Sequence, residues 1–268
     1  MLLTFPAMIT HTPDVVVIGG GINGASCAYH LASRGLRVAV LEREVAPAMG
    51  STGKSAAGVR VQFTTAANIR LSMYSLPVYR EFAQRHGREI GYQDIGYLLL
   101  VPEAKWPKHL EAVELQRQLE APVEVLDPQE AQRYVDFDTT GLAGATFGPW
   151  DGVIDPHMAT LAWVEMAREL GVSFHMRTPV TAIESGPSGW TVTGGNARWS
   201  CAHVVNAGGA WSGEIAALAG LHVPVGPKRI QIFLSGPVAD TRTYPLTIDL
   251  AAVGYLRSEG NGVLFGLD

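Results

Sequence analysis

A glycine-rich segment at residues 14–42 constrains the fold of this chain more than any other part of the sequence. It reads DVVVIGGGINGASCAYHLASRGLRVAVLE: an apolar run, glycines in G-x-G-x-x-G spacing, an amphipathic stretch and a second apolar run. This order predicts a strand, a helix and a second strand that together bind a dinucleotide. Gly19 permits the tight turn after the first strand, the missing side chain of Gly21 lets a pyrophosphate approach the backbone, and Gly24 lets the helix pack close to the sheet.

The acidic residue that ends the second apolar run, Glu42, indicates which dinucleotide fits. A carboxylate there accepts hydrogen bonds from ribose hydroxyls and repels a 2′-phosphate, so the sequence disfavours NADP, although the neighbouring cation Arg43 weakens this argument. Free amides and the positive dipole end at the helix N-terminus favour phosphate groups. The alternative is a glycine-rich turn that binds nothing. It is disfavoured because strand, glycines, helix and acid occur in the required order.

Two later segments show related chemistry. Residues 50–58 (GSTGKSAAG) are almost all small, so they cannot build a core, but their amides and hydroxyls can lie against a ligand. Taken alone, this stretch is better interpreted as a surface loop; directly after a dinucleotide-binding unit, the ligand interpretation is favoured. Residues 202–219 (AHVVNAGGAWSGEIAALA) again predict a strand, a glycine turn and a helix. In an open α/β sheet, this places a second glycine turn at the ligand crevice.

The rest of the chain contains predicted elements of both kinds. Helices are predicted over residues 66–86 with a bend or break at Pro77, over 106–120, from Asp127 onward, and from Asp155 to Gly171. Strands are predicted over residues 94–101, 172–184 with a break at Pro179, 190–193, 204–205, 229–234, 246–257 and 263–267. Residues 141–152 are glycine-rich and expected to form turns. The sequence EGNG at 259–262 predicts a hairpin, which indicates antiparallel sheet and a second domain near the C-terminus.

Composition excludes several classes of protein. A formal net charge of −5 gives no electrostatic argument for nucleic acid binding. The two cysteines, Cys27 and Cys201, make neither a disulfide framework nor a metal site, and no metal site is expected. No apolar run reaches the length of a membrane span. Residues 1–12 lack the features of a secretory signal and are expected to be a disordered or loosely packed leader, so a cytoplasmic protein is the default.

Several segments together resemble the D-amino-acid oxidase/sarcosine oxidase superfamily of FAD-dependent oxidoreductases. They are DVVVIGGGINGASCAYHLASRGLRVAVLE, GSTGKSAAGVRVQF, GVIDPHMATLAWVEMARELGV and VVNAGGAWSGEIAALAG. Their order and spacing are most similar to the branch of the sarcosine oxidase β-subunit and dimethylglycine dehydrogenase. The resemblance covers about residues 13–268, with the minor departure that Gly209 stands where the family more often has alanine.

The resemblance implies a two-domain α/β protein with FAD bound in an extended conformation. A Rossmann-like FAD-binding domain with a parallel sheet would comprise residues 13–90 and 145–224. A substrate domain with a mostly antiparallel sheet (α+β) would comprise residues 91–144 and 225–268. The family chain normally continues beyond this point. Three alternatives therefore stay open: the sequence is a fragment, a partner subunit completes the site, or the protein is without activity.

The resemblance also implies a set of site residues. The cofactor-binding residues would be Gly19, Gly21, Gly24, Glu42, Arg43, Ser51, Thr52, Ser55, Ala57, Gly58, Val180, Asn206, Ala207 and Gly208. Some relatives attach FAD through a histidine or cysteine, and Lys54 and Ser55 in the small-residue segment predict non-covalent FAD instead. Arg60 would bind the substrate carboxylate, or alternatively would hydrogen-bond loop carbonyls. The substrate wall would contain Tyr255, Leu264 and Phe265, for which ordinary core packing is the alternative.

The implied function is oxidation of the C–N bond of a small amine or amino acid, such as sarcosine, glycine, proline or dimethylglycine, by hydride transfer to the flavin. The flavin performs the redox step and the protein supplies position and electrostatics. The electron acceptor could be oxygen or an electron-transfer partner. Two alternatives remain open: an FAD-dependent hydroxy-acid or glycerol-3-phosphate dehydrogenase, and a non-catalytic flavin-binding subunit of a hetero-oligomer.

Overall fold

The computed structural model describes residues 9–240 and 242–267 and divides the chain into two units. The first unit comprises Met1–Lys54 and Pro156–Lys228, and the second comprises Ser55–Asp155 and Arg229–Asp268. Residues 55–90 and 145–155, which the sequence analysis assigned to the FAD-binding domain, therefore group with the second unit. The physical reason lies in strand pairing, because β4 (Gly58–Val59) pairs with β8 (Gly152–Val153) inside that unit.

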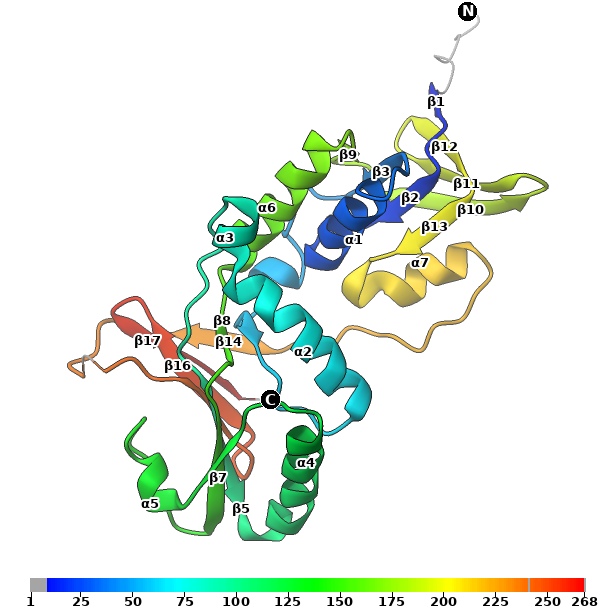
Figure 1. Cartoon of the computed structure of the whole chain (residues 1–268). Helices are drawn as coiled ribbons and strands as arrows, with labels where there is room; N and C mark the ends of the chain where they lie inside the picture. The colour runs from blue at the N-terminus through cyan, green and yellow to red at the C-terminus, as the bar shows by residue number, and fades with distance from the viewer. Residues whose placement is uncertain (1–8, 241, 268) are drawn as a thin grey trace, which may run out of the picture. The chain divides into compact units, whose positions relative to one another are not determined.

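The centre of the first unit is a parallel four-stranded sheet with the order β13-β2-β3-β9 (Figure 1). Its strands are β2 (Val15–Ile18), β3 (Val38–Leu41), β9 (Ser173–His175) and β13 (His203–Asn206). Helix α1 (Ile22–Ala32) connects β2 to β3, which confirms the predicted strand–helix–strand unit. The second glycine segment also lies as predicted, because β13 pairs in parallel with β2.

The central strands are apolar at every position because both of their faces are buried. On one face, Val15, Val17 and Val40 pack with residues of α1 and of α6 (Pro156–Glu169). On the other face, Val16 and Leu41 pack with Trp199 and its neighbours in a second sheet. The core of this unit therefore has helices on one side of the parallel sheet and antiparallel strands on the other.

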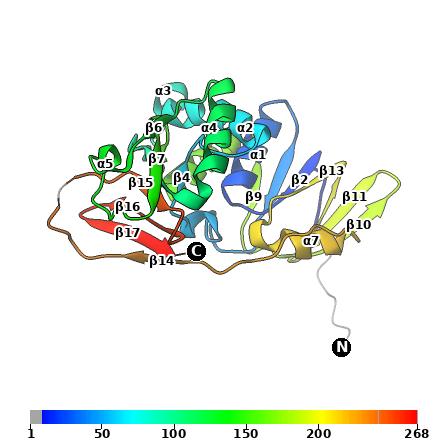
Figure 2. The ribbon, with the colours of Figure 1, turned by 90° about the horizontal axis from the view of Figure 1, so that it is seen from below.

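The second sheet of this unit has the order β1-β12-β11-β10. Its strands are β1 (Ile9–His11), β10 (Val180–Gly186), β11 (Gly189–Gly194) and β12 (Ala197–Cys201). Figure 2 shows β10 and β11 as a hairpin, with α7 (Ser212–Leu218) beside β10. The unit also contains the 3₁₀ turns Thr52–Lys54 and Gly209–Trp211. Strand β12 was not predicted from the sequence.

The expectation of a disordered or loosely packed leader over residues 1–12 is wrong for its last part. Ile9–His11 pairs in parallel with β12, and the His11 ring stacks on Trp199 with 5.2 Å between ring centroids. Backbone pairing and this ring contact order the segment. Residues 1–8 lie outside the described residues.

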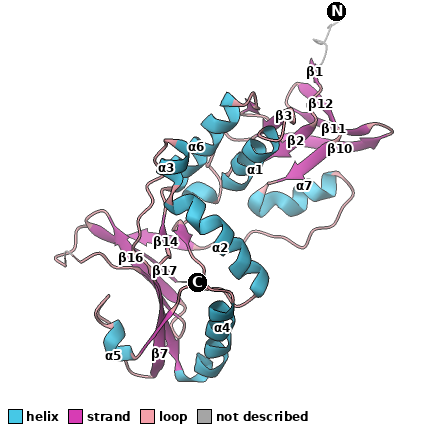
Figure 3. Cartoon of the chain, in the orientation of Figure 1, coloured by secondary structure: helices cyan, strands magenta, loops and turns pink. Residues whose placement is uncertain are grey.

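The second unit is built on a seven-stranded sheet with the order β14-β17-β16-β15-β5-β7-β6 (Figure 3). Its strands are β5 (Tyr97–Pro102), β6 (Glu124–Leu126), β7 (Leu142–Gly148), β14 (Gln231–Leu234), β15 (Leu246–Asp249), β16 (Gly254–Glu259) and β17 (Gly262–Leu267). Every pairing is antiparallel except that of β15 with β5. The mostly antiparallel second sheet and its C-terminal hairpin are thus confirmed.

Two sequence expectations fail in this sheet. Residues 141–152 were expected to form turns, but Leu142–Gly148 is a strand between β5 and β6, because pairing on both edges and burial outweigh its glycines. Residues 246–257 were expected to form one strand, but they turn at residues 250–253 and become β15 and β16.

The helices of the second unit agree better with the sequence. They are α2 (Ala66–Arg80), α3 (Phe82–His86), α4 (Trp106–Gln118) and α5 (Pro128–Ala131), with a 3₁₀ turn at Glu103–Lys105. Asp127 forms the predicted capping box with Glu130. The predicted helix at 66–86 does split, but at Glu81 rather than at Pro77, because the Glu81 amide still donates to the Pro77 carbonyl.

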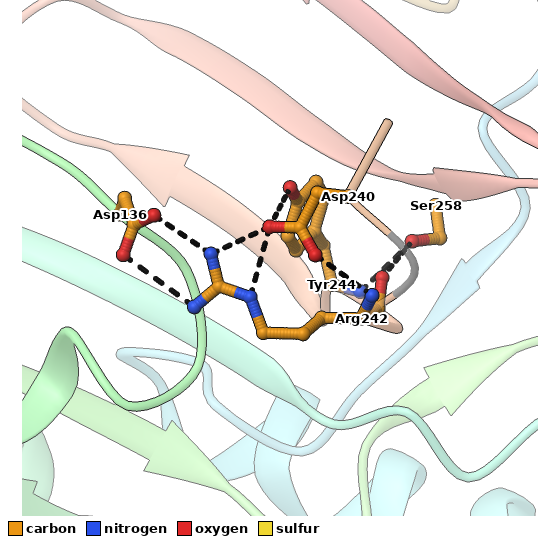
Figure 4. A network of polar contacts seen from close by, with 5 residues as sticks. All are labelled: Asp136, Asp240, Arg242, Tyr244 and Ser258. Carbon is orange, nitrogen blue, oxygen red and sulfur yellow. Dashed lines mark hydrogen bonds and ion pairs between the residues drawn. The ribbon is translucent and has the colours of Figure 1, made fainter. Parts of the chain in front are cut away.

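A polar network fixes the connection between β14 and β15 (Figure 4). The Arg242 guanidinium donates to the carboxylates of Asp136, at 2.7 Å, and Asp240, at 2.6 Å. The Tyr244 hydroxyl donates to Asp240, and the Tyr244 amide donates to the Ser258 hydroxyl at 2.8 Å. Hydrogen bonds from Arg242 lower the pKa of Asp240 well below its usual range. The network ties the loop to the sheet at an exposed position.

Among the described residues, no helix is long and apolar enough to cross a membrane.

Candidate functional site

A cavity of about 440 Å³ opens in the first unit where strands β2, β3 and β13 end. Ligands of open α/β sheets bind in this position, outside the carboxyl ends of the strands. The residues around the cavity are Ile18, Gly19, Gly21, Ile22, Asn23, Leu41, Glu42, Arg43, Glu44, Ala48, Gly50, Ser51, Thr52, Thr178, Pro179, Val180, Ala207, Gly208, Gly209, Trp211, Glu214, Ile215 and Leu218. Both glycine turns and the small-residue segment therefore contribute to one cavity.

The first glycine turn is tightly packed. Gly19 has φ +111°, and a Cβ added there would lie 2.4 Å from the carbonyl oxygen of Ala207. A Cβ added at Gly24 would lie 1.9 Å from the carbonyl oxygen of Gly19. Both positions therefore require glycine for backbone packing. Gly24 does not itself border the cavity; it holds the helix close to the strand end.

The start of helix α1 faces the cavity without a side-chain cap of its own at Gly21. Instead, the Ile22 amide donates to the Thr52 hydroxyl at 3.2 Å. The small-residue segment is held against the turn at Ala48, whose amide donates to the Gly20 carbonyl at 3.2 Å and whose φ is +64°. The cavity thus combines a helix N-terminus with small side chains, which is the arrangement that admits a pyrophosphate.

Glu42 is held rigidly at the end of β3. One carboxylate oxygen accepts the Gly20 amide at 2.5 Å, and the other accepts the Glu44 amide at 2.9 Å. A carboxylate oxygen can accept more than one hydrogen bond, so acceptor capacity remains for ribose hydroxyls. The backbone bonds fix the orientation that such a contact needs.

The side of the cavity formed by later segments combines apolar and aromatic residues with the polar Thr178 and Glu214. The Arg43 guanidinium lies over the Trp211 ring, 3.8 Å from its centroid. Val180 and Leu218 add aliphatic surface. Sequence reasoning included Arg43 and Val180 but missed Trp211. The available signal was its position at the start of the helix that follows the second glycine turn.

Asn206 organises the second glycine turn rather than bordering the cavity. Its side-chain oxygen accepts the Gly208 amide at 3.2 Å, and its side-chain amide donates to the Ser212 carbonyl at 2.8 Å. A Cβ added at Gly208 would lie 2.2 Å from Ile215 Cδ1, so the Ile215 side chain would have to move to admit it.

The predicted cofactor-binding residues therefore fall into three groups. Those that border the cavity are Gly19, Gly21, Glu42, Arg43, Ser51, Thr52, Val180, Ala207 and Gly208. Gly24 and Asn206 shape the turns around it. Ser55, Ala57 and Gly58 belong to the second unit. There, the Ser55 hydroxyl accepts the Ala57 amide at 2.9 Å, and Gly58 makes room for the Tyr97 hydroxyl.

A second cavity, of about 410 Å³, lies within the second unit. Its residues are Gly58, Val59, Arg60, Phe63, Ser72, Ser75, Leu76, Tyr79 and Tyr97. We call it the Arg60 cavity. The Arg60 guanidinium lies 4.7 Å from the centroid of the Phe63 ring and 5.6 Å from that of Tyr97. Within residues 9–240 and 242–267, no oxygen atom pairs with this guanidinium by a hydrogen bond or an ion pair.

The hydroxyls of this cavity are neutral near pH 7. Burial raises the pKa of Tyr97 to about 12, an effect that Asp151 adds to and that the positive charge of Arg60 partly offsets. Burial also raises the pKa of Tyr79. Arg60 is consequently the fixed charge at the cavity wall, and its half-buried guanidinium stacked on aromatic rings is suited to binding an anion.

The three predicted wall residues do not share one surface. Tyr255 and Leu264 lie on the same sheet face, because Tyr255 pairs with Gly266 and Arg257 pairs with Leu264. Tyr255 packs in a cluster with Tyr97. Phe265 is next to Leu264 in the strand and points to the opposite face, where its ring stacks on Phe233 at 5.5 Å. A wall containing all three residues is therefore excluded.

Sequence reasoning missed Arg257, a buried cation on the same sheet face as Tyr255. Its guanidinium donates to the Ala56 carbonyl at 3.1 Å and to the Ser258 carbonyl at 2.8 Å, and it forms an ion pair with Glu259. Unlike the Arg60 guanidinium, the Arg257 guanidinium therefore already has hydrogen-bond and ion-pair partners within the protein. It anchors the segment that leads to Gly58 and the Arg60 cavity.

Comparisons with known proteins agree with this geometry. Residues 14–268 match the family described as FAD dependent oxidoreductase. The mitochondrial dimethylglycine dehydrogenase of Rattus norvegicus is 29% identical over 264 residues, which cover 94% of this chain and 30% of that protein. This chain therefore spans about a third of the length of that relative.

Solved structures show the same fold. The crystal structure of L-proline dehydrogenase from P. horikoshii superposes with a TM-score of 0.88 at 28% identity, covering 96% of this chain and 70% of that chain. The crystal structure of glycine oxidase from Geobacillus kaustophilus gives a TM-score of 0.82 at 25% identity, covering 95% and 70%.

Proposed function

The chain belongs to the family of FAD-dependent oxidoreductases, and from this premise we propose that it oxidises the C–N bond of a small amine or amino acid. FAD is the cofactor of the family. Bound FAD would supply the redox chemistry as the acceptor of a hydride from the carbon next to the nitrogen of the neutral amine, which leaves an iminium ion; where the nitrogen carries a hydrogen, loss of that proton gives the imine. The protein's own residues supply binding, orientation and electrostatics.

The first-unit cavity has the donors and acceptors that FAD requires. Its pyrophosphate would meet the helix N-terminus at Gly21 and Ile22 and the Thr52 hydroxyl. The adenosine ribose would meet Glu42, whose orientation is fixed by backbone amides. The absence of room for a Cβ at Gly19 shows that the turn is built around glycine, as a dinucleotide turn requires. We propose non-covalent binding, because Lys54 and Ser55 offer neither an imidazole nor a thiol.

The main support for the proposed substrate class is the Arg60 cavity. Dimethylglycine, proline and glycine, which appear in the names of the relatives, each combine a carboxylate with a C–N bond on the neighbouring carbon. The unpaired Arg60 guanidinium would bind such a carboxylate. The Tyr97 hydroxyl in the wall of the same cavity stays neutral near pH 7. No general base is needed if the substrate binds as the neutral amine.

Anaerobic reduction of bound flavin tests this proposal. The purified protein, reconstituted with FAD, is mixed with dimethylglycine, sarcosine, glycine or proline, and the visible absorbance of the flavin is followed. We expect at least one of these substrates to bleach it. Bleaching by a hydroxy acid or by glycerol 3-phosphate alone would favour the dehydrogenase alternative. Stable flavin binding without bleaching by any of these compounds would favour a non-catalytic flavin-binding role.

Substitution of Arg60 tests the substrate contact. Arg60→Leu should raise KM by about ten- to a hundredfold, because a charge-assisted hydrogen bond contributes about 1.5–3 kcal/mol. Arg60→Lys keeps the positive charge but loses the planar guanidinium, so its KM should lie between those of the natural protein and Arg60→Leu. An unchanged KM in Arg60→Leu would remove Arg60 from the substrate site.

A further inference from the structure

The residues that follow Arg60 are held by a buried carboxylate, Asp151. Asp151 lies between β7 and β8 and is 0% exposed. One of its oxygens accepts the Val61 amide at 2.7 Å, and the other accepts the side-chain amide of Gln62 at 3.1 Å. The backbone just after Arg60 is therefore pinned by one acidic side chain.

A chain of buried polar groups continues from Gln62. Its side-chain amide nitrogen also donates to the Tyr97 carbonyl at 3.1 Å, and its side-chain oxygen accepts the Thr146 hydroxyl at 2.8 Å. Thr146 in turn contacts the His109 ring nitrogen at 2.9 Å. Gly148 leaves the space for Asp151, because a Cβ added there would lie 2.1 Å from its carboxylate. The network is fully connected and therefore rigid.

Asp151 is the acid next to Arg60 whose charge changes near neutral pH. Burial raises the pKa of Asp151 to about 7, although hydrogen bonds from Val61 and Gln62 and the charge of Arg60 act in the opposite direction. The other titratable groups that act on it or share its network are Asp94, Tyr92, Tyr97 and His109. The pKa of each of the two tyrosines is raised, and burial lowers the pKa of His109.

We propose that Asp151 is a positioning residue for Arg60, and that carboxylate binding in the Arg60 cavity is linked to uptake of a proton by Asp151. The inference rests on the proposed function, since it assumes that the Arg60 cavity binds a substrate carboxylate. An ionised Asp151 and a bound carboxylate are both stabilised by the positive charge of Arg60, and the two negative charges repel each other. Binding of the carboxylate therefore favours protonated Asp151, and protonation favours binding to the same extent.

Acetate is the probe, because it is a carboxylate without an amine and cannot be oxidised at a C–N bond. Its dissociation constant is measured by titration calorimetry of the FAD-reconstituted protein at about pH 5.5 and about pH 8.5, on either side of neutrality. The measurement is repeated near neutral pH in buffers with different ionisation enthalpies, which reports the protons taken up. Asp151→Asn removes the titrating charge. The Asn oxygen can still accept the Val61 amide, but the Asn amino group faces the Gln62 amide nitrogen, which cannot turn away without losing its bond to the Tyr97 carbonyl, so this variant is expected to fold with lower stability.

Asp249→Asn is the matched control. Asp249 lies in the same unit and likewise accepts two hydrogen bonds, from the backbone amides of Ala251 at 2.7 Å and Ala252 at 3.2 Å, but it does not border the Arg60 cavity. We expect the dissociation constant of acetate to rise about fivefold or more from the lower to the higher pH in the natural protein and in Asp249→Asn. Proton uptake should accompany binding in both. Asp151→Asn should bind acetate with nearly the same affinity at both pH values.

The proposal is overturned if Asp151→Asn keeps the natural pH dependence, or if acetate binding is absent or independent of pH in the natural protein. Should Asp151→Asn fail to fold, carbon NMR of the aspartate carboxyls in the natural protein replaces it. Saturating acetate must then raise the pKa of one buried aspartate, and no such change overturns the proposal. Failure to oxidise any amine would refute the proposed function alone, because acetate binding is measured without turnover.

Discussion

Replacing Gly24 by alanine tests whether the first glycine turn is built by backbone packing. The added Cβ would lie 1.9 Å from the Gly19 carbonyl oxygen, and the neighbouring atom is main chain. An ordinary carbon–oxygen contact is about 3.3 Å or longer, so the helix and the strand end must separate by about 1.4 Å. Such overpacking destabilises a fold by about 1–3 kcal/mol, and the better helix propensity of alanine offsets about 1 kcal/mol of this.

The expected net loss is about 1 kcal/mol, which corresponds to a decrease in Tm of about 2–4 °C for a chain of this size. FAD binding should weaken more, because the same displacement moves the amides of Ile22 and Asn23 away from the pyrophosphate. Loss of one charge-assisted hydrogen bond alone costs about 1.5–3 kcal/mol, or at least about tenfold in Kd. Thermal unfolding monitored by circular dichroism and quenching of flavin fluorescence measure the two effects.

Gly226→Ala is the control for Gly24→Ala, because an added Cβ at Gly226 meets nothing within 4 Å. Its stability should change by no more than about 0.5 kcal/mol. If Gly24→Ala keeps both the natural Tm and the natural Kd for FAD, close helix–strand packing is not what this glycine provides.

Three further predictions concern individual side chains. Glu42→Ala removes the proposed ribose ligand and the acceptor of the Gly20 amide, so the Kd for FAD should rise about ten- to a hundredfold; an unchanged Kd would exclude Glu42 from that role. Trp211→Ala removes the ring under Arg43 and should lower stability by about 0.5–1 kcal/mol, a loss that urea unfolding would detect and that Arg43→Ala should reproduce. The pKa of Asp151 is about 7 in the folded protein and about 4 in the unfolded chain, because the buried carboxyl is harder to ionise. Its contribution to the free energy of unfolding is therefore fully present below about pH 4 and is lost as the pH rises to about 7. The total is on the order of 4 kcal/mol, and unfolding of Asp151→Asn across this pH range should lack that slope, whereas a retained slope would assign it to another group.

The sequence by itself determined the dinucleotide-binding half of this protein. Glycine spacing, apolar strands and the acid Glu42 are local features. In this order along the chain they are compatible with few structures other than a dinucleotide-binding strand–helix–strand unit. The strand–helix–strand unit, the parallel neighbour β13 and the glycines of the first-unit cavity were accessible in this way. Periodicity and the capping signature at Asp127 likewise placed helices correctly.

Tertiary structure decided the features that depend on distant residues. Leu142–Gly148 is a strand because two neighbours pair with it, which its own glycines do not indicate. Phe265 points away from Leu264 because side chains alternate in a strand, and only the pairing register shows which face each one takes. The contact between Arg43 and Trp211 joins residues that are far apart in sequence.

The same reason explains Asp151. Nothing in its local sequence shows that it is buried or that it holds the residues after Arg60, because Val61 and Gln62 lie some ninety positions earlier in the chain. A local motif fixes the chemistry that one short segment can perform. The charge, burial and hydrogen bonds around a side chain are set by whichever distant segments pack against it, and these only the folded structure specifies.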